Sequence, residues 1–429
     1  MDSMTTAQSE YLHASDIRGM AQLATEATSG VVSMAEGVHQ SVLSTLGIPP
    51  GNTPEQTGGI TGLLYESIRG VTRLLGKKLD RALARLQPVL ESAEQAPQGS
   101  RQREAVLAVL NGLMGDSLAS TDNPLATPMT FHYLDEAPKP TGKVLLLIHG
   151  LCMNDLEWHG EVVDHGAALA LALGYAPIYL RYNSGLHTSK NGRQLASMLE
   201  GLVAQWPTPI EELSVVAHSM GGLVARSAVY YARQEALSWP GRLKSIVFLG
   251  TPHHGAPLER AGNWVDVLMG RSPYTAPFSK LGHVRSAGIT DLRYGFVVDE
   301  DWRGQDRFRR RRDSRQLVPL PDGVACYAVA ATLSNEPDGL IGDGLVPVAS
   351  ALGQHDEARR TLAFSEGSKW IAYGMNHLQL LSSPEVTLRL QRWLAQPSFA
   401  SDCLGAAFEG QGFLARQPED GPGPASSRS

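Results

Sequence analysis

The stretch "LSVVAHSMGGLVARS", residues 213–227, decides the fold. It is apolar and β-branched at first, places Ser219 between Ala217 and Gly221, and then becomes amphipathic. A strand that turns at once into a helix needs small residues on both sides of its turn, because the two backbones nearly touch there. The pattern therefore predicts a strand, a strained turn at Ser219, and a helix whose first N–H groups can stabilise an anion.

The composition is that of a globular protein with ample material for a core. The chain has 429 residues, of which 42% are hydrophobic and 19% are charged, enough for one large domain with an extension or for two modest domains. A net charge of −6 argues against a general nucleic-acid binder, and we expect no nucleic-acid partner. The three cysteines, Cys152, Cys326 and Cys403, lie far apart and predict reduced thiols.

The first residues, "MDSMTTAQSEYLHASD", are acidic and polar, which is not typical of a signal peptide. No apolar run approaches the ~18 residues that a membrane-spanning helix needs. We therefore expect a cytoplasmic protein. Export by a route without a cleaved signal is the alternative.

Residues 1–120 are expected to form a helical extension that takes no part in the catalytic core. A first helix is predicted from the cap at Ser15 or Asp16 toward Leu46, a second over the apolar series in residues 60–86, and a third, shorter one over "REAVLAVLNGLMG".

The second of these helices carries a slanted basic band with a step of four residues. Its members are Arg69, Arg73, Lys77, Arg81 and Arg85. An apolar face beside cations suits peripheral contact with an anionic membrane through residues 60–86. The alternative, which we favour, is a helix packed on the core with its arginines in water.

From Met129 onward the pattern changes to short apolar runs separated by helical segments, which predicts an α/β fold with a mostly parallel central sheet and helices on both faces. The runs are "MTFHYL", "KVLLLIHG", "APIYLRY", "LSVVAHS", "KSIVFLGT", "VACYAVAAT" and "KWIAYG". We expect a catalytic domain over residues 121–398. Within it, residues 255–321 contain no clear strand and are expected to form a cap or lid insertion. Residues 415–429 are expected to form a disordered tail.

A serine nucleophile needs hydrogen-bond donors for the oxyanion that forms when it attacks a carbonyl. The strand in "VLLLIHGLCMND" ends at His149-Gly150, so the next N–H, that of Leu151, can point into the site. Met220, which follows the serine, supplies a second N–H. His149 itself is interpreted as a structural residue that hydrogen-bonds the loop.

The nucleophile also needs a base and an acid that orients the base. "DGLIGDGLVPVASA" offers Asp338 and Asp343, and we favour Asp343 because the apolar segment 345–348 can anchor it against the sheet. His377 lies directly after the last apolar run. The order Ser219, Asp343, His377, each after a separate strand, is the chain order of the α/β-hydrolase triad.

Four motifs, "LLLIHGL", "VVAHSMGGLVAR", "FLGTPHHG" and "DGLVPVASA", resemble the α/β-hydrolase superfamily, and within it the branch of lipases and inositol-deacylase-like ester hydrolases. The resemblance covers roughly residues 129–395. It implies that Ser219 is the nucleophile, Asp343 the acid and His377 the base, with the amides of Leu151 and Met220 as the oxyanion hole.

The same resemblance gives expectations for two further places. His253 and His254, in "GTPHHG", are expected to shape the wall of the site rather than to transfer protons. Many lipases of this branch carry an acidic calcium ligand two residues after the catalytic histidine, whereas this chain has Gln379 there. Calcium prefers carboxylates, so we expect no structural calcium, no other metal and no cofactor.

The motifs together favour a serine carboxylic-ester hydrolase of the lipase or esterase type that acts on lipid or other acyl esters. A thioesterase, an amidase or an acyltransferase would need the same residues, and a binding protein on a hydrolase fold is the alternative from another class. Trp264, Leu268 and Met269 are candidates for an acyl pocket, or else form the insertion's own core. The arginine-rich run over residues 307–315 is interpreted as a solvated loop rather than an anion site.

Overall fold

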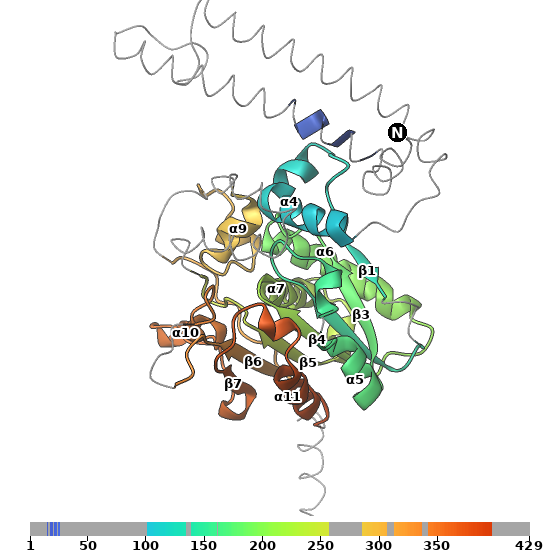
Figure 1. Cartoon of the computed structure of the whole chain (residues 1–429), viewed down its shortest axis with the longest axis vertical. Helices are drawn as coiled ribbons and strands as arrows, with labels where there is room; N and C mark the ends of the chain where they lie inside the picture. Colours follow the sequence, from blue (N-terminus) through green and yellow to red (C-terminus); the bar gives the residue numbers. More distant parts are fainter. Residues whose placement is uncertain are drawn as a thin grey trace, which may run out of the picture.

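The computed structural model describes residues 101–133, 139–160, 162–256, 285–306, 313–336 and 342–396, together with Ser15, Arg18, Gly19, residues 21–23 and Thr25 (Figure 1). Several predicted features lie outside these residues. They are most of the first two N-terminal helices with the basic band, the lining candidates Trp264, Leu268 and Met269, the alternative acid Asp338, Cys403, and the tail over residues 415–429.

The centre of the structure is a seven-stranded sheet in the order β1-β3-β2-β4-β5-β6-β7. The strands are β1 (Thr130–His132), β2 (Lys143–Ile148), β3 (Ala176–Arg181), β4 (Glu212–His218), β5 (Leu243–Leu249), β6 (Ala325–Ala331) and β7 (Lys369–Ala372). β1 pairs antiparallel with β3, and every other pairing is parallel. Each of the seven apolar runs contains one strand, which confirms the predicted α/β fold.

Helices connect the strands. The α-helices are α4 (Arg101–Ser120), α5 (His165–Leu173), α6 (Thr188–Gln205), α7 (Met220–Gln234), α9 (Ala287–Leu292), α10 (Val348–Ala351) and α11 (Pro384–Leu394). The short 3-10 helices are Asp155–Trp158, Trp239–Arg242, Asp299–Asp301, Ala358–Arg360, Glu366–Ser368 and Gln379–Leu381. Among the described helices, none combines the length and the apolar character needed to cross a membrane.

The strand order places these helices on both faces of the sheet. The connection through α5 leads from β2 outward to β3, and the connection through α6 leads back past β2 to β4. Right-handed crossovers in opposite directions put α5 and α6 on opposite faces. α7 packs on α6, and α11 packs on α5 (Figure 1). The carboxyl ends of the central strands therefore meet at one edge, where a site can form.

The central strands are almost free of solvent contact. Residues 144–148 of β2 have no exposed surface, and Val216 and Ala217 of β4 are equally buried. Cys152 and Cys326 are buried free thiols, as the spacing predicted, and burial raises the pKa of each to about 12.

Helix α4 differs from the expectation for the N-terminal 120 residues. It is longer than predicted, because it continues to Ser120 across a non-helical residue, Met114. Val109 and Leu113 of α4 belong to the main hydrophobic core. The expectation that no residue before 121 takes part in the core is therefore wrong for α4. The domain boundary at residue 120 stays a prediction.

The other side of α4 contacts the described residues near the N-terminus. Leu110 and Leu118 of α4 form a second apolar cluster with Leu125, against which Leu23 packs. Asn123 donates from Nδ2 to the carbonyl oxygen of Gly19 at 3.1 Å. The described residues between 15 and 25 are helical, in agreement with the first predicted helix.

Candidate active site

Ser219 occupies a strained turn between β4 and α7. Its φ of 54° and ψ of −124° place a residue with a side chain in a region that glycine usually occupies. Its N–H donates to the carbonyl oxygen of Leu249 at 2.8 Å, and its hydroxyl is buried and makes no hydrogen bond to another described residue. A Cβ at Gly221 would lie 2.6 Å from the carbonyl oxygens of Ile148 and His149. Position 221 must therefore be small because α7 begins in close contact with the end of β2.

His377 and Asp343 form a buried pair after two different strands. His377 Nδ1 donates to Asp343 Oδ2 at 2.6 Å, and each side chain is about 1% exposed. Asp343 Oδ1 accepts the N–H groups of Leu345 and Val346 at 2.9 and 2.7 Å. These bonds fix the carboxylate, as the apolar anchor after Asp343 suggested. With its proton on Nδ1, a neutral imidazole carries its basic lone pair on Nε2.

His218, which sequence reasoning did not single out, connects this pair to the turn at Ser219. His218 Nε2 donates to the carbonyl oxygen of His377 at 3.0 Å, and the two rings lie 4.6 Å apart. On the other side of His377, a Cβ at Gly250 would lie 3.1 Å from its ring. The loops after β4, β5 and β7 therefore meet around His377.

The two amides proposed for the oxyanion hole lie in the loops that meet at Ser219. The N–H groups of Leu151 and Met220 make no hydrogen bond to any residue that the structure describes. A Cβ at Gly150 would lie 3.0 Å from Ser219 Cβ, so the loop after β2 comes as close as its glycine allows. Cys152, at a φ of 57°, bends the chain directly after Leu151.

His149 has the structural role that the sequence predicted. Its Nδ1 bonds the carbonyl oxygen of Gly150 at 2.8 Å, and its ring stacks on Tyr182 at 4.3 Å. The hydroxyl of Tyr182 donates to the carbonyl oxygen of His149 at 2.8 Å. Burial lowers the pKa of His149 to about 4, so the ring stays neutral and supports the loop.

α4 supports the same loop from outside. A Cβ at Gly112 would lie 2.2 Å from Cys152 Sγ, so helix and loop are in the closest contact that glycine permits. Asn154 Nδ2 donates to the carbonyl oxygen of Glu104 at 3.1 Å, and the Glu104 carboxylate pairs with Arg181 at 2.6 Å. α4 therefore positions the loop that carries Leu151.

His253 and His254 of "GTPHHG" lie in the loop after β5. His253 is buried and its ring packs edge-on against Phe248 at 4.8 Å, and His254 Nε2 donates to the carbonyl oxygen of Gly353 at 3.0 Å. Both histidines make contacts within the protein, His253 with β5 and His254 with Gly353 after α10. Their role in the wall of a substrate site stays a prediction. Arg315 departs from the interpretation of its run as a solvated loop, because its side chain is 8% exposed and pairs with Asp313 at 2.6 Å, whereas residues 307–312 lie outside the described residues.

Gln379 supports the loop of His377. Its side-chain oxygen accepts the N–H of Asn376 at 2.8 Å, and Asn376 in turn accepts the N–H groups of Leu378 and Gln379 at 3.0 Å. In the described ranges, no group of three His, Cys, Asp or Glu residues is arranged to hold a metal ion.

A family model described as "Domain of unknown function (DUF7379)" matches residues 118–290. No curated protein matches the chain. Among solved structures, a Bacillus licheniformis lipase in its mature form is similar at 18% identity and a TM-score of 0.40, over 62% of this chain and 97% of that one. A Pyrococcus furiosus esterase is similar at 15% identity and a TM-score of 0.35, over 59% and 80%. An α/β-hydrolase fold protein from Chitinophaga pinensis is similar at 12% identity and a TM-score of 0.36, over 63% and 98%.

The strand order and the turn at Ser219 define the class of protein. Six parallel strands follow an antiparallel edge strand, and the serine lies between a central strand and the helix that follows it. This is the α/β-hydrolase arrangement, in which the residue at the turn lies at the carboxyl edge of the sheet.

Proposed function

We propose that the chain is a serine carboxylic-ester hydrolase of the lipase or esterase type. The observation that carries the proposal is the buried hydrogen bond between His377 Nδ1 and Asp343 Oδ2, next to a serine in a strained strand-to-helix turn. A fold that serves only for binding has no physical need of an imidazole oriented by a buried carboxylate.

In the proposed reaction, Ser219 Oγ attacks the ester carbonyl while His377 Nε2 takes the hydroxyl proton. Asp343 accepts the Nδ1–H and stabilises the imidazolium that forms. The N–H groups of Leu151 and Met220 bind the oxyanion, and His377 then protonates the leaving alcohol. Water activated by the same imidazole hydrolyses the acyl-enzyme and restores Ser219.

The substrate is proposed to be a lipid or another acyl ester. A thioesterase, an amidase and an acyltransferase use the same nucleophile and base, and they differ in the leaving group and the acceptor. A series of p-nitrophenyl esters of increasing acyl length, with matched thioesters and anilides, separates these alternatives. A hydrolase of acyl esters should prefer the esters by kcat/KM.

Labelling with a fluorophosphonate probe tests the proposal directly, because the probe phosphorylates only an activated serine. The wild type should be labelled at Ser219, and Ser219→Ala, which only removes a hydroxyl, should fold normally and stay unlabelled. Ester hydrolysis should fall by several orders of magnitude in the same variant. An unlabelled wild type, or hydrolysis that survives in Ser219→Ala, would contradict the proposal.

A further inference from the structure

A cavity of about 360 Å³ lies beside α7, and none of Ser219, Asp343 and His377 lines it. Its walls come from α7, the loop after β5, the segment before β6 and the segment before β7. Its polar lining includes Arg226, Arg315, Arg359 and Arg360, and its apolar lining includes Val318 and Leu362. A cavity of this size is in the range of small-molecule sites.

Arg226 is the unusual member of the lining. It belongs to α7, is 6% exposed, and forms no ion pair with a carboxylate of the described residues. Its Nη1 donates to His253 Nδ1 at 3.4 Å, its Nη2 donates to the carbonyl oxygen of Val318, and its Nε has no hydrogen-bond partner among the described residues. A buried cation without a direct ion pair is costly, and a bound anion would lower that cost.

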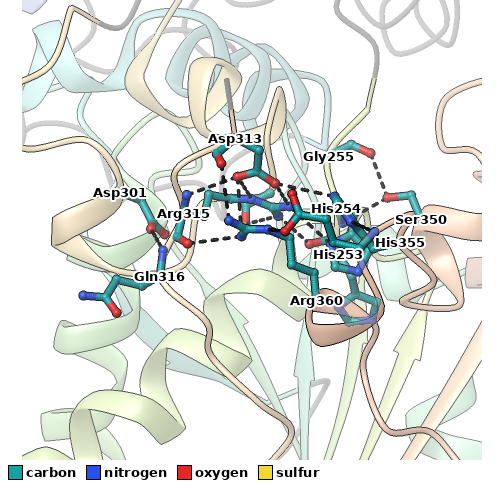
Figure 2. A network of polar contacts seen from close by, with 12 residues as sticks. His253, His254, Gly255, Asp301, Asp313, Arg315, Gln316, Ser350, His355 and Arg360 are labelled. Carbon is teal, nitrogen blue, oxygen red and sulfur yellow. Dashed lines mark hydrogen bonds and ion pairs between the residues drawn. The ribbon is translucent and has the colours of Figure 1, made fainter. Parts of the chain in front are cut away.

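The neighbouring carboxylates are already engaged. Asp313 pairs with Arg315 at 2.6 Å and lies 3.7 Å from Arg360 (Figure 2). Asp301 Oδ2 accepts the N–H groups of Val297 and Val298, and its Oδ1 accepts that of Gln316. The charge of Asp301 acts on Arg226 without an ion pair between the two, and Asp322 also lines the cavity, so the charge of the Arg226 guanidinium is compensated only in part.

The histidines of the cavity do not add to that charge. Burial, followed by the charge of Arg226, lowers the pKa of His253 well below its usual value. Burial also lowers the pKa of His254 to about 4. A hydrogen bond to Gly353 opposes this shift, and the charge of Arg315 adds to it. Because His253 Nδ1 accepts from Arg226, the proton of its neutral ring is on Nε2, which has no acceptor among the described residues.

We propose that this cavity binds a small organic anion, with a carboxylate or phosphate group against the Arg226 guanidinium and a short apolar part against Val318 and Leu362. A buried guanidinium beside apolar side chains binds such groups more strongly than an exposed arginine does. The site is independent of the proposed hydrolytic reaction, because its charge and its walls do not involve Ser219.

Thermal unfolding of the full chain tests the site with two probes, inorganic phosphate and hexanoate, at ionic strength held constant with sodium chloride. Saturating ligand should raise the Tm by about 4 °C. Arg392→Gln, which removes the same charge from an exposed position on α11, should respond as the wild type does. Arg226→Gln should lose the response. Because the readout is not activity, its result does not depend on whether the chain hydrolyses esters.

A second variant covers the case in which Arg226→Gln does not fold. Ala363 is an exposed residue of the lining, so Ala363→Trp should fill the mouth of the cavity without disturbing the core, and it should abolish the response. A response to hexanoate alone would identify a carboxylate site, and a response to both probes a general oxyanion site. No response in the wild type, or an unchanged response in Arg226→Gln or in Ala363→Trp, would overturn the proposal.

Discussion

The residue directly before the strained serine holds the backbone of the proposed base: His218 Nε2 donates to the carbonyl oxygen of His377 at 3.0 Å. This bond joins the end of β4 to the loop after β7, and a second bond joins that loop to the segment after β6, where the Asp343 carbonyl oxygen accepts the N–H of His377 at 3.2 Å. The backbone of His377 is therefore fixed from two sides, which leaves its ring little freedom to move away from the turn.

Asp343→Asn should lower kcat by about four orders of magnitude with little change in fold. The asparagine oxygen can still accept the N–H groups of Leu345 and Val346, so the loop is retained. Its NH₂ group can only donate toward His377 Nδ1, which puts the imidazole proton on Nε2 and removes the base. Ester hydrolysis and circular dichroism of the same sample check this, and a variant with more than a tenth of the wild-type kcat would exclude Asp343 as the orienting acid.

Gly112→Ala should reduce hydrolysis although residue 112 lies outside the predicted catalytic domain. The new methyl group would lie 2.2 Å from Cys152 Sγ and 2.8 Å from its Cα, so α4 and the loop of Leu151 must separate. A displaced oxyanion donor costs roughly 100-fold in kcat.

The matched control is Gly201→Ala on α6, where an added Cβ has no atom within 4 Å. It should leave kcat unchanged and stabilise the chain by about 0.5–1 kcal/mol, because alanine loses less backbone entropy in a helix. Equal kinetics for the two variants would show that α4 does not position the loop.

The free energy of unfolding should fall as the pH falls from 6.5 toward 4. Burial lowers the pKa of His254 to about 4 in the folded state, so only the unfolded chain takes up a proton there in this range. The unfolded state is stabilised by about 2 kcal/mol at pH 5 for such a residue. Urea unfolding at pH 7.5 and pH 5 should show a smaller loss for His254→Gln than for the wild type, and equal losses would contradict the assignment.

A chelator should change neither the Tm nor the activity. Gln379 stands where the lipases that the sequence motifs resemble carry an acidic calcium ligand, and its side-chain oxygen already accepts the N–H of Asn376. A chelator lowers the Tm only by removing an ion that stabilises the folded state, and we expect no such ion here. Melting in EDTA and in calcium chloride checks this, and a Tm several degrees lower in EDTA would reveal a calcium site built from other residues.

The strands and the turn at Ser219 could be predicted because their signals are local. A run such as "KVLLLIHG" is apolar, contains β-branched residues and ends in glycine, and the small residue at 221 signals a close backbone approach, which the structure makes to the end of β2. Asp343 and His377 followed from their places after separate strands, and the structure joins their side chains.

The contacts that were missed depend on packing between distant segments. His218 and His377 are 159 residues apart, and nothing near either one signals the bond. α4 has apolar residues on two sides, with Val109 and Leu113 in the main core and Leu110 in the second cluster. Its periodicity therefore does not identify one buried face, and its partners could not be inferred from the sequence.

The position of α4 also bears on folding during synthesis, because part of its packing depends on a segment that is made much later. Ser286 Oγ donates to the carbonyl oxygen of Gly112 across 174 residues, and Asp116 accepts the N–H of Ala287 across 171. α4 emerges from the ribosome long before these partners do. Until then its inner face lacks the contacts from α9, and loop closure over such separations is slow. The contacts of α4 with α9 therefore form only after Ser286 and Ala287 have been made, and until then this part of the helix that supports the Leu151 loop stays uncovered in the nascent chain.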